Sequence, residues 1–158
     1  MIVGGSVIAL LTLILGTRYN GTGGVTIEAA INTGEALPYD FIMKILFTAI
    51  TIGFGYKGGE IIPTFFIGST MGAVLGSLIG LPPAFAAAIG MVALFCGVVN
   101  CPIASLVLSV ELFGSEGLLF FAVAVCLSYM LSGYYGLYSG QKIIYSKRRA
   151  RYINRNAK

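Results

Sequence analysis

The sequence predicts an all-α fold: a polytopic transmembrane helical bundle with short, broken and re-entrant helices. Of its 158 residues, 57% are hydrophobic and only 10% are charged, and the mean hydropathy is +0.90. Residues 61–110 and 117–141 contain no charged side chain. Soluble domains are rarely so apolar, and a crossing needs roughly 20 apolar residues, so these stretches hold about three to four crossings.

Helix breakers divide the chain into segments of unequal length. Several of these segments are too short to cross a bilayer, and Val25–Asn32 and Pro102–Phe113 could cross only part of it, which indicates broken or re-entrant helices of the kind that channels and transporters contain. The first segment lacks the basic start and cleavage site of a signal peptide, so we interpret it as a helix that is kept. The expected helices are Ile2–Leu15, about Val25–Asn32, Tyr39–Phe54, Ile61–Ile79, Pro83–Val99, Pro102–Phe113, Glu116–Ser132 and Tyr135 to about Ser146.

The charge distribution suggests a domain boundary and an orientation. Seven of the ten basic residues lie between Lys142 and Lys158. We therefore expect a transmembrane domain over 1–146 and a basic tail over 147–158. Positive flanks stay inside, so we expect a multi-pass protein of the cell membrane with a cytoplasmic C-terminus. A tail that binds anionic lipid headgroups is an alternative on the same side, whereas a nucleic-acid partner is not expected.

Glycines recur at helical spacing at Gly68, Gly72 and Gly76, followed by Gly80. Small residues at this spacing let a second helix approach closely, so we interpret the stripe as a packing face.

The residue types disfavour an enzyme and a metal site. The chain has no histidine, its three cysteines show no CxxC spacing, and Asp40 is its only aspartate. A membrane-embedded enzyme, a metal centre, a disulfide and a cofactor are therefore not expected.

The stretch GFGYKGGEIIPTFF, residues 53–66, contains the strongest candidate site. Its GxGxxG pattern lacks the βαβ context of a dinucleotide site. Pro63 suits the first turn of a helix, and Gly58 and Gly59 leave access to the backbone before it. The N–H groups of Glu60 and Ile61 would then point outward at the positive helix end and could hold an anion, although an ordinary capped helix start is the alternative.

Glu60 complicates this anion site. A carboxylate and an anion about 4 Å apart repel by roughly 4 kcal/mol at an effective dielectric of 20. Glu60 should therefore be neutral, or turned away, while the anion is bound, which would couple protons to anions. The alternative is a capping carboxylate whose partner is the helix dipole or Lys57.

Two further segments hold polar groups of interest. Asn100–Pro102 starts another short helix, in which Glu111 comes late and has neighbouring backbone as its simplest partner. Tyr138 lies among glycines that would let its hydroxyl reach an interior site as a neutral donor. Membrane-interface tyrosines that merely anchor the chain are the alternative.

Three stretches resemble, in order and spacing, the C-terminal half of CLC-type anion channels and antiporters: GGEIIPTFFIGSTMGAVLG, GMVALFCGVVNCPIASLVLSVELF and LYSGQKI. The resemblance implies one half of an inverted-repeat transporter fold. It also implies an anion site at Gly58, Gly59, Glu60, Ile61 and Ile62, with Tyr138 contacting the same ion.

The GGE start resembles the bacterial branch of this family that exchanges fluoride for protons. Ile61 stands where chloride-type members usually carry Phe, and Ile62 stands where the fluoride branch often carries Thr. The resemblance therefore implies fluoride/proton antiport, with a chloride channel or a chloride/proton antiporter as the alternative.

The family also needs an N-terminal half, with a glutamate gate, that these residues do not contain. We therefore expect a fragment or a split half that partners an N-terminal half, with complete subunits forming a homodimer. The partners implied are a halide anion, fluoride or chloride, together with protons and the lipid membrane. A transport-inactive fragment that acts only in assembly is the alternative of another class.

Overall fold

The computed structural model describes residues 2–138, 140–147, 149 and 151–157. Two compact units make up the chain, residues 1–91 and 92–158, and the helix α5 (Pro83–Val99) runs through the boundary between them. Two of the basic residues assigned to the tail, Arg148 and Lys158, lie outside the described residues.

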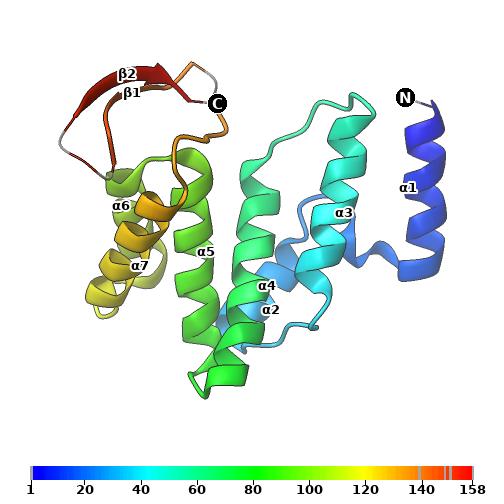
Figure 1. Cartoon of the computed structure of the whole chain (residues 1–158). Coiled ribbons are helices and arrows are strands. Elements are labelled where there is room, and N and C mark those ends of the chain that lie inside the picture. Colours follow the sequence, from blue (N-terminus) through cyan, green and yellow to red (C-terminus); the bar gives the residue numbers. More distant parts are fainter. Residues whose placement is uncertain (1, 139, 148, 150, 158) are drawn as a thin grey trace. The chain divides into compact units, whose positions relative to one another are not determined.

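The first unit is built from helices whose bounds agree closely with the predicted ones. Prolines and glycines punctuate the chain at these points, which is why the bounds were predictable. Helix α4 packs against both α2 and α3, and α1 packs against α3 (Figure 1). The elements are α1 (Ile2–Leu15), the 3-10 turn η1 (Thr17–Tyr19), α2 (Gly24–Asn32), α3 (Asp40–Gly53), α4 (Ile61–Ile79) and the first half of α5.

Three buried aromatic side chains form the core of this unit. The ring of Tyr19 lies 5.7 Å from that of Phe47 and 6.4 Å from that of Phe66, measured between centroids. Because the three residues come from η1, α3 and α4, this cluster fixes the turn before α2 against the two central helices. Ile8, Leu11, Leu15, Ile27 and Met43 pack around it.

Asp40 fixes the 3-10 turn η1 through its fully buried carboxylate. Its oxygens accept hydrogen bonds from Arg18 Nη2 at 2.7 Å, from Tyr19 Oη at 2.8 Å and from the backbone N–H of Leu37 at 2.9 Å. A buried carboxylate with this many donors is a structural tether. It joins η1 to the start of α3.

The glycine stripe on α4 is a packing face, as predicted. A Cβ at Gly68 would lie 2.8 Å from the carbonyl oxygen of Gly90, and one at Gly72 or Gly76 would collide with Ala86. The backbones of α4 and α5 therefore approach so closely that no side chain fits between them. Gly80 plays a different part, because it ends α4 in a left-handed conformation with φ 77°.

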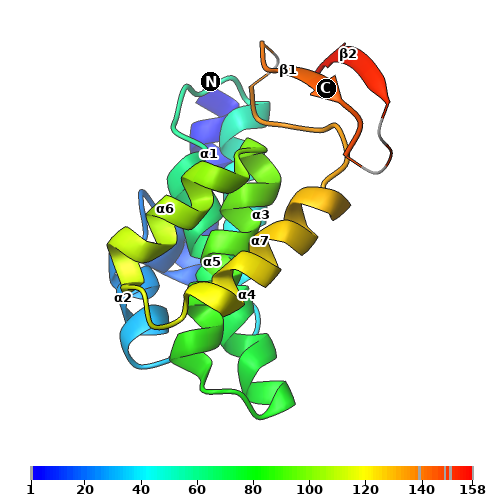
Figure 2. The same ribbon diagram turned by 90° about the vertical axis from the view of Figure 1, so that its left-hand side faces the viewer.

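The second unit contains the rest of α5, α6 (Pro102–Phe113) and α7 (Leu118–Leu131) (Figure 2). Phe113 stacks on Phe121, with 5.6 Å between the ring centroids, so the end of α6 packs on the start of α7. Ser128 Oγ donates a hydrogen bond to the carbonyl of Ala93 at 2.6 Å, which ties α7 to α5.

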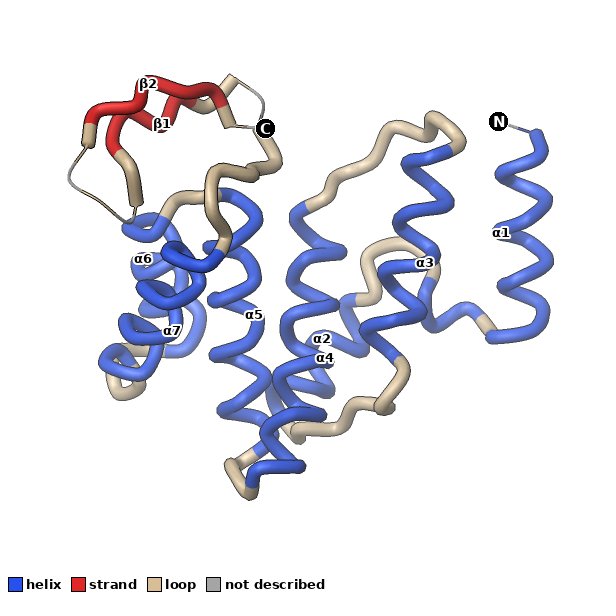
Figure 3. The backbone as a smooth tube through the Cα atoms, in the orientation of Figure 1, coloured by secondary structure: helices blue, strands red, loops and turns tan. Residues whose placement is uncertain are grey.

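The helix predicted from Tyr135 to about Ser146 is wrong. Residues Lys142–Tyr145 form strand β1, which pairs antiparallel with β2 (Tyr152–Asn156) (Figure 3). Ile143 and Ile144 favour a strand, and the partner strand lies beyond a turn, so helical spacing was the wrong guide. The predicted boundary between 146 and 147 falls in this turn and stays a prediction.

The charge-free stretches are broken into short helices, as the sequence predicted. Among the described residues, α4 alone has both the length and the apolar composition to cross a membrane. The other helices of these stretches, α5, α6 and α7, have 17, 12 and 14 residues. The breaks at 80–82 and 100–101 interrupt the longer charge-free run, and the number of crossings stays a prediction.

Candidate functional site

The predicted site lies where a glycine-rich loop leads into α4 (Figure 3). Glu60 is the residue before the first helical position, with φ −92° and ψ −14°. Its carbonyl accepts hydrogen bonds from the N–H of Thr64 at 3.2 Å and from Thr64 Oγ1 at 2.8 Å. Pro63 therefore occupies the first turn, where its missing N–H leaves nothing unsatisfied.

The backbone N–H groups at this helix start have no acceptor. Within the part of the chain that the structure describes, those of Glu60, Ile61 and Ile62 make no hydrogen bond. A Cβ placed on Gly58 or Gly59 would meet no heavy atom within 4 Å. The positive end of α4 is therefore neither capped nor covered by neighbouring side chains.

The carboxylate of Glu60 is half-buried and does not cap the helix. Over residues 2–91 it makes no hydrogen bond or ion pair, and Arg18–Asp40 is the only ion pair present. Within residues 2–91, Glu60 therefore forms neither a side-chain capping bond nor an ion pair with Lys57, and the alternative in which the helix dipole is its partner stays open.

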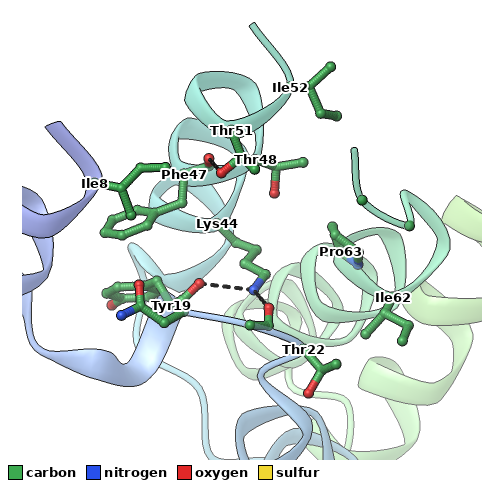
Figure 4. Close-up of a pocket in the computed structure, with 14 residues that line it drawn as sticks. Ile8, Tyr19, Thr22, Lys44, Phe47, Thr48, Thr51, Ile52, Ile62 and Pro63 are labelled. Carbon is green, nitrogen blue, oxygen red and sulfur yellow. Dashed lines mark hydrogen bonds between the residues drawn. The ribbon is translucent and has the colours of Figure 1, made fainter. Parts of the chain in front are cut away.

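A cavity of about 470 Å³ lies beside this helix start (Figure 4). Three residues of the predicted site, Gly58, Gly59 and Ile62, form one wall together with Pro63, whereas Glu60 and Ile61 are not among the lining residues. The opposite walls come from the turn before α2 and from α3. They are made by Tyr19, Asn20, Gly21, Thr22, Lys44, Phe47, Thr48, Thr51 and Ile52, with Ile8 of α1.

Lys44 in this cavity wall escaped the sequence-based site prediction. Its side chain is 2% exposed, and its Nζ donates to the carbonyls of Tyr19 at 3.0 Å and Gly21 at 2.7 Å. The ammonium also lies 5.0 Å from the centre of the Phe66 ring. A signal existed, because Lys44 is the only cation in the apolar run DFIMKILFTAITIG, and an ionisable residue inside such a helix is a functional suspect.

In the second unit, Tyr138 follows α7 in the loop that leads to β1, and its side chain is 49% exposed. Its hydroxyl has no hydrogen-bond partner among the described residues of this unit. Tyr138 as an anion contact stays a prediction. Glu111 is exposed near the end of α6, so it is not part of a buried site.

The backbone just before α6 is held in place by hydrogen bonds from other residues of the second unit. Asn100, 6% exposed with φ 58°, donates from Nδ2 to the carbonyl of Tyr135 and accepts at Oδ1 from Ser132 Oγ at 3.2 Å and from Lys147 Nζ. Lys147 also donates to the carbonyl of Tyr129 at 3.0 Å, and burial lowers the pKa of Lys147.

Comparison with known proteins identifies the family. A model of the family described as voltage gated chloride channel matches residues 1–133. The chain belongs to this family. A chloride/fluoride channel protein of Pseudomonas syringae pv. tomato is 39% identical over 151 residues, which are 91% of this chain and 33% of that protein. An uncharacterised protein of Methanocaldococcus jannaschii is 37% identical over 75 residues, 48% of this chain and 19% of that protein.

The crystal structure of a CLC-type fluoride/proton antiporter shares the fold of this voltage-gated chloride channel family member. The TM-score is 0.81 at 34% sequence identity, and the match covers 86% of this chain and 35% of the antiporter. The chain thus spans about a third of the length of these two relatives. The predicted resemblance and the helical transporter fold are confirmed, and the chain is a membrane protein.

Proposed function

We propose that this chain forms the C-terminal half of a CLC-type pathway for small halide anions, which works in the complete subunit as a fluoride/proton antiporter. The observation that carries the proposal is the uncapped start of α4, where unpaired amides stand beside a carboxylate without a partner. Two relatives, a chloride/fluoride channel protein and a fluoride/proton antiporter, support the same class of substrate.

In this proposal the anion binds to the N–H groups of Glu60 and Ile61. Ile62 contributes to the same turn, and Gly58 and Gly59 leave the approach open. The helix dipole favours a negative charge at this end. Backbone dipoles hold the anion without a full positive charge, so they also release it, as conduction requires. The hydroxyl of Tyr138 is proposed as a further neutral donor to the anion.

Glu60 is proposed to couple protons to the anion. Its ionised carboxylate and an anion about 4 Å away would repel by roughly 4 kcal/mol at an effective dielectric of 20. Occupancy by the anion therefore favours a protonated or displaced Glu60. Glu60 itself makes no capping bond and no ion pair within residues 2–91, which supports this role, because no such bond has to break for its side chain to move.

Chloride transport, by a channel or by a chloride/proton antiporter, is the second candidate. Ile62, 41% exposed in the first turn of α4, is the observation that favours it. An alkyl side chain offers no hydroxyl to replace the water that fluoride, the more strongly hydrated ion, must give up.

The working unit is proposed to be larger than this chain. The unpaired amides of α4 would face a matching helix start from an N-terminal half, as in inverted-repeat transporters. Complete subunits are proposed to form a homodimer in the cell membrane, with several crossings and a cytoplasmic C-terminus. A fragment that assembles without transporting is the outcome expected if no flux is found.

The test is reconstitution in liposomes together with an N-terminal half from this family. Fluoride and chloride efflux are followed with ion electrodes, and proton movement is followed in parallel. We expect Glu60→Gln to abolish proton coupling while anion efflux continues, since the amide side chain cannot exchange a proton. Glu111→Gln, which changes an exposed carboxylate at the end of α6, is the matched control and should leave coupling intact.

Unchanged coupling in Glu60→Gln would remove this residue from the mechanism. Efflux of chloride with no efflux of fluoride would favour the second candidate. If the chain copurifies with the N-terminal half but neither halide moves, the assembly function replaces transport.

A further inference from the structure

Lys44 is a buried cation without an acidic partner. Its side chain is 2% exposed, and over residues 2–91 no carboxylate lies within 4.0 Å of its ammonium, since the only ion pair there joins Arg18 to Asp40. The ammonium donates hydrogen bonds to the carbonyls of Tyr19 and Gly21. Carbonyl dipoles satisfy two of its N–H groups but do not neutralise its charge, and a buried charge that is not neutralised is costly.

The space next to Lys44 suits a small anion. The cavity of about 470 Å³ has no Asp or Glu among its lining residues, so Lys44 contributes its only full charge. Thr48, one helical turn from Lys44 on α3, lines the cavity and makes no side-chain hydrogen bond within residues 2–91. In Figure 4 the hydroxyl of Thr48 lies between α3 and Pro63. The neighbouring Thr51 is different, because its hydroxyl already donates to the carbonyl of Phe47 at 2.7 Å.

We propose that this cavity is a second anion-binding site, in which Lys44 and Thr48 hold a small monovalent inorganic anion. Lys44 has one N–H left beyond its two carbonyl contacts, and the hydroxyl of Thr48 is a neutral donor. The cavity adjoins the start of α4: Gly58, Gly59 and Ile62 line it, whereas Glu60 and Ile61 do not.

Gly58 and Gly59 connect the two sites. Both line the cavity, and both immediately precede Glu60. These two glycines therefore lie between an anion bound at Lys44 and the amides of α4. The positive charge of Lys44 raises the local concentration of anions, and its carbonyl contacts limit how tightly it holds one. The identification of the anion as a transported halide rests on the proposed function.

A purely structural Lys44 would only tie the turn before α2 to α3. The two roles differ at Thr48, because its hydroxyl bonds to no other described residue of this unit. A structural lysine predicts that removing this hydroxyl changes nothing, whereas an anion site predicts weaker binding.

The experiment measures binding of sodium fluoride and sodium chloride to the purified chain in detergent by isothermal titration, with sodium gluconate keeping the ionic strength constant. Lys44 and Thr48 belong to α3, so a loss of affinity in their variants reports the cavity and not the amides of α4. We expect Lys44→Met to weaken binding at least about tenfold, Lys44→Arg to retain it, and Thr48→Val to weaken it by about threefold. Lys57→Met, which removes an exposed lysine near the same helix start, is the matched control and should bind as the parent does.

Equal affinity in the parent and in Thr48→Val, or in a folded Lys44→Met, would overturn the inference. Thr48→Val breaks no hydrogen bond within residues 2–91, so it decides the question even where Lys44→Met does not fold. Binding that depends on Lys44 and Thr48, without halide efflux from liposomes that also hold an N-terminal half, would reject the proposed function and leave the second site standing.

Discussion

The starts of α4 and α6 are built on the same local pattern and differ in what surrounds them. Each helix has a proline in its first turn, and in each the carbonyl before the helix accepts the first helical hydrogen bond, Glu60 from Thr64 and Cys101 from Ser105. Before α6, Asn100 is buried and held by Tyr135, Ser132 and Lys147. Before α4, the glycines have open space around them.

The difference shows that unpaired first-turn amides alone do not make a site. The N–H of Ile103 in α6, like that of Ile61 in α4, has no acceptor among the described residues of its unit. Gln141 lies over the backbone before α6, with its Nε2 3.4 Å from the carbonyl of Asn100 and 3.7 Å from Cys101 Sγ. At α4 the glycines leave an open approach, a cavity adjoins them, and Glu60 makes no hydrogen bond or ion pair within residues 2–91.

The largest effect on stability is expected from Asn100→Ala at the closed helix start. The change leaves the Tyr135 carbonyl without its donor, removes one of the three acceptors of the Lys147 ammonium and puts alanine at φ 58°. We expect the free energy of unfolding to fall by about 3 kcal/mol. Unfolding in a detergent titration measures it.

Asn154→Ala is the control for backbone strain alone. Asn154 is exposed and also has a positive φ of 40°, but its side chain makes no hydrogen bond to the described residues. We expect a loss of about 1 kcal/mol. Equal losses in the two variants would show that strain, and not the polar contacts of Asn100, stabilises the closed helix start.

The second largest effect is expected from Gly59→Leu. It is an effect on halide transport and not on stability. The added side chain has open space, so the fold is kept, but it covers the approach to the α4 amides. We expect halide efflux to fall at least about tenfold, which is about 1.4 kcal/mol.

Gly53→Leu is matched to this variant, because Gly53 also has open space for a Cβ and lies at the end of α3 away from the cavity wall. It should transport normally. If both variants transport like the parent, the open glycines before α4 do not lead to the ion.

The smallest effect is expected from Gln141→Leu. The amide oxygen of Gln141 is buried without a hydrogen-bond partner among the described residues, and its nitrogen makes only long contacts. Removing the unsatisfied oxygen offsets the loss of these contacts, so the free energy of unfolding should change by no more than about 0.5 kcal/mol. A loss above about 1.5 kcal/mol would mean that Gln141 closes the start of α6 by its hydrogen bonds.

Local signals made the helices predictable from the sequence, and contacts between distant residues explain what was missed. Pro63, Pro83, Pro102 and Gly80 mark helix ends through backbone geometry that the chain carries locally. The pairing of β1 with β2 depends on a second strand, which helical spacing around Tyr135 does not reveal.

The candidate site likewise has features that the local sequence predicts and features that depend on distant residues. The free amides at Glu60 and Ile61 follow from one proline and two glycines, so they were predictable. The burial of Lys44 was not, because the carbonyls that it contacts belong to Tyr19 and Gly21, 25 and 23 residues away along the chain. The tether at Asp40 depends on Arg18 and Tyr19 in the same way.

The most direct test of the account replaces the peptide bond before Ile61 by an ester, which removes a single N–H and leaves every side chain in place. The same change before Ile103 at the start of α6 is the control. We predict that the ester at Ile61 weakens halide binding in the complete protein by about tenfold, or about 1.4 kcal/mol, and that the ester at Ile103 has no effect. Equal halide affinity with and without the N–H of Ile61 would contradict the account.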